Sequence, residues 1–365
     1  MSSRKLPRAQ ALSQLLMALA VNAVDDDPDS TTLSDVQQRL ANTIAQVVTR
    51  GNDQPIVQAL EGLDAEHAHD AADLVSFWAD DAAQTLDIML TSPDGPVHGT
   101  ANFVVIPFFV ANLGSDPLPV DLRRYPQFDG LAKSLRAHQL LGPEPTLYFS
   151  GGFYRLEDLP QSWAVRRDRL QRLTEEAAGQ RAPQLLATPE PPPDGPPEAL
   201  QSSLRFLVGV IFADDDDDSI LWDLLEPDSV SDDVVADRFD AWRVEAASLM
   251  EDMLPTVPHV LPGAPALWAE GVAGGIALWN EMVSAILLED HCHQANAVPD
   301  RVLADIRWMA EDEAWQIVFV SPTLTSAPQR WLVAEDPVDS REDLTEYLRT
   351  LGIRRFSVDE SGLPL

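Results

Sequence analysis

The sequence predicts an α+β protein, and three observations along its 365 residues support that class. Residues 9–82 carry apolar side chains at helical spacing, which predicts an N-terminal helical region. Later runs rich in β-branched and aromatic residues are separated by turn-forming residues, which predicts strands. The clearest is Leu204–Leu225, where two apolar runs flank five aspartates, and it predicts a β-hairpin whose first strand lies in the core.

Residues 9–82 are expected to form four helices. Ser34 stands where an N-cap of the second helix belongs, and Gly51 follows that helix at the place where glycine commonly ends one. Basic residues precede the first helix, as they do in a signal peptide, but Ser13 and Gln14 interrupt its apolar run. We therefore expect an amphipathic helix there, and no run reaches the ~18–20 apolar residues of a membrane span.

The remaining elements follow in a repeated order of hairpin, helix and strand. This order occurs three times, and either internal duplication or convergence on a common motif accounts for it. The strands are expected at 84–91, 99–110, 146–150, 204–213, 259–261, 305–310, 314–320, 330–334 and 353–358, and the helices at 127–141, 159–178, 232–254, 266–288 and 340–351.

The domain boundary is predicted at a proline-rich segment. Seven of the sixteen residues in 182–197 are prolines, which cannot continue a helix and favour an extended connector. We therefore predict a helical region at 1–82, a first α+β domain at 83–181, a linker at 182–198 and a second, strongly acidic α+β domain at 199–365.

A net charge of −34 limits the classes of partner. It argues against binding nucleic acid through phosphates and against an anionic membrane surface, and it favours basic partners or cations. Residues 1–181 hold 24 acidic and 15 basic side chains (net −9), whereas residues 198–365 hold 33 and 10 (net −23). The single cysteine excludes an internal disulfide and suits a reducing, cytoplasmic compartment.

Two charged features are candidates for partner binding. The tip of the predicted hairpin consists of Asp214, Asp215, Asp216, Asp217 and Asp218. It is either a solvated turn that blocks edge pairing or a surface for a basic partner, and it lacks the spaced ligands of an EF-hand.

The second charged feature is an arginine-rich helix with Arg166, Arg167 and Arg169. These arginines either pair with the chain's own aspartates or dock the acidic domain of the same or a second copy.

A metal site is the main alternative. His291, Cys292 and His293 lie together, and His259 is a further ligand type that the fold must bring near. The other interpretation is a helix C-terminus, where histidines interact favourably with the helix dipole. No nucleotide motif or nucleophile elbow is present, since Ser150-Gly151 gives only part of one, and we predict no cofactor.

The segments YRLEDLP (154–160) and RFLVGV (205–210), on either side of the proline-rich break, resemble a proteobacterial family of uncharacterised proteins known only as a domain of unknown function. The resemblance covers about a third of the chain and implies a bacterial cytoplasmic protein. From the residues, we expect a non-enzymatic, acidic interaction protein that binds a basic protein or mimics nucleic-acid charge. The alternative is a metal-dependent enzyme with a site near His291 and His293.

Overall fold

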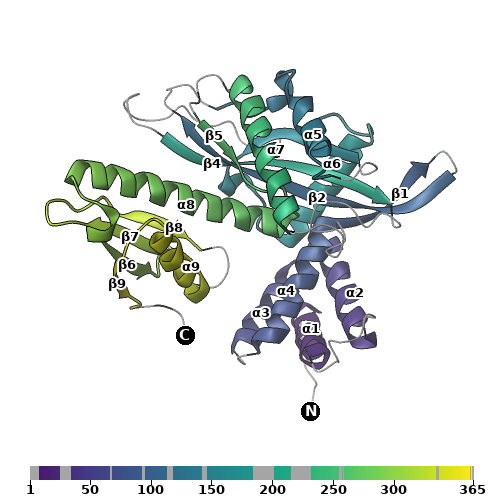
Figure 1. The fold of residues 1–365 in the computed structure, drawn as a ribbon. Helices are drawn as coiled ribbons and strands as arrows, with labels where there is room; N and C mark the ends of the chain where they lie inside the picture. Colours follow the sequence, from purple (N-terminus) through teal and green to yellow (C-terminus); the bar gives the residue numbers. More distant parts are fainter. Residues whose placement is uncertain are drawn as a thin grey trace, which may run out of the picture. The chain divides into compact units, whose positions relative to one another are not determined.

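The protein has the predicted α+β class (Figure 1). The computed structural model describes residues 8–24, 34–65, 68–92, 95–112, 118–141, 146–183, 201–214, 232–254, 257, 259–333, 337–361 and 363. The chain divides into two compact units, one of residues 1–104, 129–188 and 208–239, the other of residues 105–128, 189–207 and 240–365.

Four helices form the N-terminal region, with the bounds α1 (Arg8–Val24), α2 (Asp35–Thr49), α3 (Gln54–Ala65) and α4 (His69–Gln84). They share one core, in which Leu16, Ile44, Ile56 and Val75 are fully buried. Ser34 caps α2 as predicted, because its Oγ accepts a hydrogen bond from the Gln37 amide at 3.1 Å and its own amide donates to Gln37 Oε1. The chain then leaves α2 through a left-handed glycine, Gly51 (φ +72°).

One sheet contains β1 (Thr85–Ser92), β2 (Gly95–Asn112), β3 (Thr146–Tyr154), β4 (Gln201–Asp214) and β5 (His259–Pro262). Its order is β1-β2-β4-β3, and β5 pairs with β2. β1 and β2 form an antiparallel hairpin whose register runs from Thr85↔Asn102 to Ser92↔Gly95. Most side chains of β2 and of β4 are buried, which explains why the sequences of both strands are almost continuously apolar.

The compact units differ from the predicted domains. β4 follows the proline-rich segment but belongs to the same sheet as β1, β2 and β3, and the division between the units falls within β2 and β4. A pattern of apolar runs shows where strands are but not which strands pair. The pairing of β4 with strands that precede the prolines therefore cannot be predicted from the sequence, and the proline-rich segment looks like a domain boundary. Residues 184–198 of the expected linker, and the second strand of the hairpin, lie outside the described residues.

Two helices accompany the strands of the first unit, α5 (Phe128–Ala137) and α6 (Trp163–Ala177). Each is shorter than predicted, and α6 begins at Trp163 rather than Leu159 because a 3-10 turn (Leu156–Asp158) and Pro160 come first. Ser162 is the N-cap of α6, and its Oγ accepts from the Val165 amide at 3.3 Å.

The longest helix among the described residues, α8 (Trp268–Ala295), follows α7 (Asp232–Met253). Glycines let α8 pack closely on strands, since a Cβ at Gly271 would lie 2.8 Å from Val105 Cβ and one at Gly275 would lie 2.5 Å from Phe206 Cε1. Contrary to the expectation from the sequence, α8 is long and apolar enough to cross a membrane by length and composition, and only 28% of its most apolar window is buried inside the protein. Core helices of soluble proteins meet the same criterion, so this feature assigns no membrane location.

The C-terminal part of the chain forms a second sheet from β6 (Leu303–Met309), β7 (Ala314–Val320), β8 (Gln329–Leu332) and β9 (Arg355–Asp359). The order is β8-β7-β6-β9, so β8 is an edge strand of this sheet. At the other edge, β9 runs parallel to β6. Helix α9 (Pro337–Thr350) precedes β9 and shares a core with this sheet and α8, through Leu288, Trp331, Leu344 and Leu348. The repetition of one unit along the chain stays a prediction.

Candidate functional site

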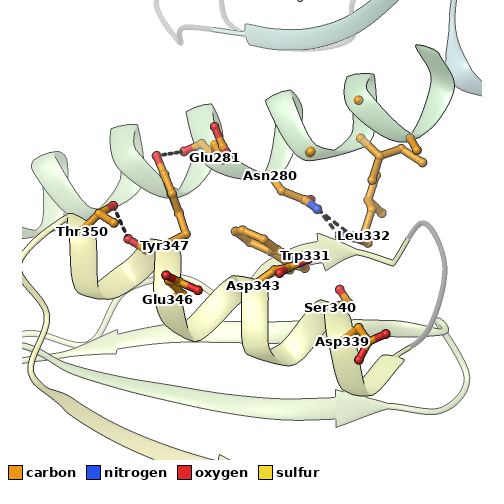
Figure 2. A pocket seen from close by; sticks show the side chains of 14 residues that line it. Asn280, Glu281, Trp331, Leu332, Asp339, Ser340, Asp343, Glu346, Tyr347 and Thr350 are labelled. Carbon is orange, nitrogen blue, oxygen red and sulfur yellow. Dashed lines mark hydrogen bonds between the residues drawn. The ribbon is translucent and has the colours of Figure 1, made fainter. Parts of the chain in front are cut away.

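A groove lies between α8 and α9 and has β8 as its floor (Figure 2). Its volume is about 560 Å³, which lies within the range of ligand-binding sites. Fourteen described residues line it: Ala273, Gly274, Ile276, Ala277, Asn280, Glu281, Trp331, Leu332, Asp339, Ser340, Asp343, Glu346, Tyr347 and Thr350. None of these fourteen is Lys, Arg or His.

Helix α9 gives the groove its acidic wall. Asp339, Asp343 and Glu346 follow one another at i, i+4 and i+7, so they lie along one stripe of the helix. The opposite stripe of α9 carries Leu344 and Leu348, which are fully buried in the core below. Because these leucines fix the rotation of α9, the three carboxylates face the groove and solvent. Within the described part of the chain, Asp343 and Glu346 make no ion pair.

The floor of the groove is aromatic. The Trp331 side chain rises from β8 with only 5% of its surface exposed, and its ring centroid is 6.0 Å from that of Tyr347 on α9. The Tyr347 hydroxyl donates a 2.9 Å hydrogen bond to the Glu281 backbone carbonyl and thereby ties α9 to α8. Figure 2 shows this bond at one end of the groove.

At this end of the groove, partial desolvation shifts the pKa values of Tyr347 and Glu281. Desolvation, together with the charge of Glu281, raises the pKa of the Tyr347 hydroxyl to about 12. Desolvation also raises the pKa of the Glu281 carboxyl, although Arg243 opposes that shift. Tyr347 is therefore a neutral hydrogen-bond donor at physiological pH, and a cation beside Glu281 would be stabilised by a partly desolvated carboxylate.

Asn280 closes the edge of β8 at the other side of the floor. Its amide nitrogen donates to the Leu332 carbonyl at 2.8 Å, and its carbonyl oxygen accepts from the Leu332 amide at 2.9 Å. The side chain is 2% exposed and thus replaces a neighbouring strand for one residue. An apolar helix tolerates this buried amide because both of its polar ends are satisfied.

The structure does not assemble the predicted metal ligands. No group of three or more His, Cys, Asp or Glu side chains is placed to hold a metal ion anywhere in the described ranges. His291 is buried at 2% exposure in α8, whereas His259 and His293 are exposed and Cys292 is half-buried. α8 continues to Ala295, so the three neighbouring ligands point to different sides of a helix.

The predicted arginine surface is engaged inside the chain. Arg166 is 7% exposed and its Nη1 lies 2.8 Å from Asp80 Oδ1. Arg167 donates to the carbonyls of Ala82 and Thr85, and Arg169 donates to the Asp158 carbonyl at 3.1 Å. Arg166 thus pairs with an aspartate of its own chain, which is one of the two alternatives from the sequence. The contacts of all three arginines hold α6 in place. Docking of a second copy stays a prediction.

The remaining candidates offer no open site among the described residues. Asp214 ends β4, and Asp215, Asp216, Asp217 and Asp218 lie outside the described residues. Ser150 is fully buried in β3, where its hydroxyl lies 3.0 Å from the Tyr154 hydroxyl. Substrate has no access to a serine in that position.

The sequence contained two signals of the groove that motif reasoning missed. The first is the acidic stripe at helical spacing along 339–346, and the second is Gly274, a third glycine next to the two that pack against strands. A Cβ added at Gly274 would meet no atom within 4 Å. Neither signal predicts a groove until the partners of α8 and α9 are known.

Comparison with known proteins gives no relative from which to transfer a role, since no family model, curated protein or solved structure matches the chain. The resemblance to a bacterial family of uncharacterised proteins stays a prediction.

Proposed function

We propose that this protein is a non-enzymatic, cytoplasmic interaction protein that binds a basic segment of a partner protein in the α8–α9 groove. One observation carries the proposal: an apolar floor of Trp331, Leu332 and Ile276 is rimmed by carboxylates and by no basic side chain. Apolar surface supplies binding free energy, and the carboxylates of Asp343 and Glu346, which make no ion pair with the described residues, select cationic side chains.

The charge of the whole chain acts in the same direction. A net charge of −34 produces a field that attracts cations over the distance at which salt does not screen it. Lysine and arginine carry both a cationic end and an apolar stem, so such side chains satisfy the rim and the floor together. The described lining of the groove contains no histidine or cysteine, and its Thr350 hydroxyl donates to the Tyr347 carbonyl rather than to a carboxylate, an arrangement that favours binding over catalysis.

A charge-reversal experiment tests the proposal. The probe is a fluorescein-labelled peptide of about twenty residues, built from lysine, leucine and alanine, whose affinity is measured by fluorescence anisotropy. The test variant is Asp343→Arg with Glu346→Arg, because both side chains are exposed on α9 and line the groove. The matched control is Glu251→Arg with Asp252→Arg, two exposed acids of α7 outside the groove, which changes the net charge equally.

We expect the test variant to weaken binding about tenfold or more, because two favourable contacts of up to about 1 kcal/mol each become repulsive. The control should lose less than about threefold, which is the effect of net charge alone. Thermal melts should show that both variants fold. Equal loss in the two variants, or no binding by the wild-type chain, would overturn the proposal.

A further inference from the structure

The outer strand of the C-terminal sheet carries a surface that is complementary to itself. Strand β9 is the last in the order β8-β7-β6-β9, and Figure 1 shows it at the margin of this sheet. We propose that two copies of the chain associate through β9, antiparallel and in a register centred on Ser357. This surface contains no residue that lines the α8–α9 groove, so the proposal goes beyond the proposed function and does not depend on it.

The main chain of β9 is open on one side. The strand pairs with β6 from Leu303↔Arg355 to Arg307↔Asp359, so alternate main-chain groups of β9 point away from β6. Within the described ranges these outward groups have no main-chain hydrogen bond. The opposite edge of the sheet differs, because the Asn280 side chain occupies both main-chain groups of Leu332 in β8. A further strand can therefore add at β9.

The side chains of β9 are also accessible. Four of its five residues are exposed, and Phe356 is half-buried, with the Arg349 guanidinium 5.4 Å from the centroid of its ring. Val358 lies on the same face as Phe356 and is 40% exposed although it is apolar. The described part of the chain thus leaves both faces of β9 largely uncovered.

Antiparallel pairing about Ser357 places complementary residues opposite one another. Arg355 of one copy then lies opposite Asp359 of the other, which pairs unlike charges. Phe356 lies opposite Val358, which pairs apolar side chains, and the two copies of Ser357 face each other. Because the symmetry is two-fold, each unlike pair occurs twice, and about four to six main-chain hydrogen bonds join the strands. A shift by two residues, the smallest that keeps the faces aligned, separates Arg355 from Asp359.

The two charged residues are available for this contact. Arg355 makes no ion pair within the described ranges, on a chain with 59 acidic and 25 basic residues. Asp359 Oδ1 accepts from the Ser361 amide at 3.0 Å and from the Ser361 hydroxyl, which leaves Oδ2 without a partner among the described residues. Arg307, the neighbour of Asp359 in β6, already pairs with Asp305 at 2.6 Å. Each copy can therefore supply the charge that the other lacks.

Exchanging charges within β9 tests the proposal. Sedimentation equilibrium of the full chain measures association at about 0.15 M NaCl, where the Debye length of about 8 Å screens most repulsion between two acidic molecules. The test variants are Arg355→Asp and Asp359→Arg, studied singly, combined in one chain, and as an equimolar mixture of the two single variants. The matched controls are Arg301→Asp and Glu311→Arg, at exposed positions outside β9, and thermal melts show whether each variant folds.

We expect the mass of the wild-type chain to approach that of a dimer as concentration rises. Each single variant should associate at least about tenfold more weakly, because both charge pairs of the dimer become repulsive. These two variants change the net charge in opposite directions, so a loss in both cannot come from net charge. The double variant and the mixture should regain association, since each restores unlike pairs, and the controls should behave as wild type.

Three outcomes would overturn the proposal. They are a wild-type chain that stays monomeric up to about 1 mM, a folded single variant that associates as strongly as wild type, and a folded double variant that associates as weakly as the single variants. Peptide binding in the α8–α9 groove is measured separately, so failure of the β9 contact would leave the proposed function standing.

Discussion

His291 shows at the scale of one residue how an unsatisfied polar group is placed in a core. Its ring is 2% exposed, lies 6.3 Å from the Phe319 ring, and neither ring nitrogen has a hydrogen-bond partner among the described residues. Burial lowers the pKa of this imidazole, and the charge of Asp290 opposes the shift only in part. The histidine that resembled a metal ligand in the sequence is thus a neutral core residue.

This environment predicts that acid destabilises the fold. The unfolded chain binds a proton at His291 near the ordinary pKa of 6.5, whereas the folded chain binds it only at a lower pH. The free energy of unfolding should therefore be level above pH 7.5 and fall below pH 6.5, by at most about 1.4 kcal/mol per pH unit from this group. Urea denaturation of wild type and His291→Leu between pH 8 and pH 6 measures the difference.

His291→Leu should show little slope over that range and a higher free energy of unfolding, since it removes two unsatisfied nitrogens. His293→Gln is the control, because this exposed side chain lies on the same helix and its removal should leave the slope. If His291→Leu retained the wild-type slope, the titration would belong to another group.

At the scale of elements, the clearest long-range contact is the capping of α6 by a residue from the start of α3. The Asp53 carboxylate accepts hydrogen bonds from the Ala164 amide at 3.0 Å and from the Ser162 hydroxyl. The carboxylate thus lies at the positive end of the α6 dipole and satisfies a main-chain donor that has no partner within the helix. The two helix starts are 109 residues apart in the sequence.

Removing this cap should destabilise the first unit. We expect Asp53→Ala to lower the free energy of unfolding by about 1–2 kcal/mol, the usual cost of losing a helix cap. Asp64→Ala, at an exposed position near the end of α3, should change it by less than about 0.5 kcal/mol. Thermal and urea denaturation measure both variants, and an equal effect of the two would show that Asp53 acts through charge alone.

The elements differ in how well the sequence predicts them, according to whether the residues that delimit an element lie near it in the sequence. Local signals are strong for α2, because Ser34, Gln37 and Gly51 lie within the segment that they delimit. The start of α6 depends on Asp53, and the edge of β8 depends on Asn280, so in both cases the decisive partner is distant in the sequence. The fold class therefore follows from periodicity, whereas the pairing of β4 with earlier strands and the groove between α8 and α9 require tertiary structure.

At the scale of the whole molecule, the excess of 34 negative charges affects stability and binding in opposite ways. Repulsion among like charges destabilises a compact chain, whereas the same charges attract a basic partner. Salt screens both effects, with a Debye length of about 10 Å at 0.1 M.

Raising NaCl from about 0.05 M to about 0.5 M should therefore increase the melting temperature by several degrees and weaken binding of the lysine peptide about tenfold or more. Differential scanning calorimetry and anisotropy measure the two responses in the same buffers. The Asp343→Arg, Glu346→Arg variant should keep most of the salt-dependent rise in melting temperature, because it removes only two of 59 acidic residues. Its residual affinity for the peptide should depend less on salt, because the two carboxylates that attract the lysines are gone. A melting temperature that rises with salt while peptide affinity stays constant would mean that the acidity serves solubility or salt tolerance and that the groove does not recognise charge.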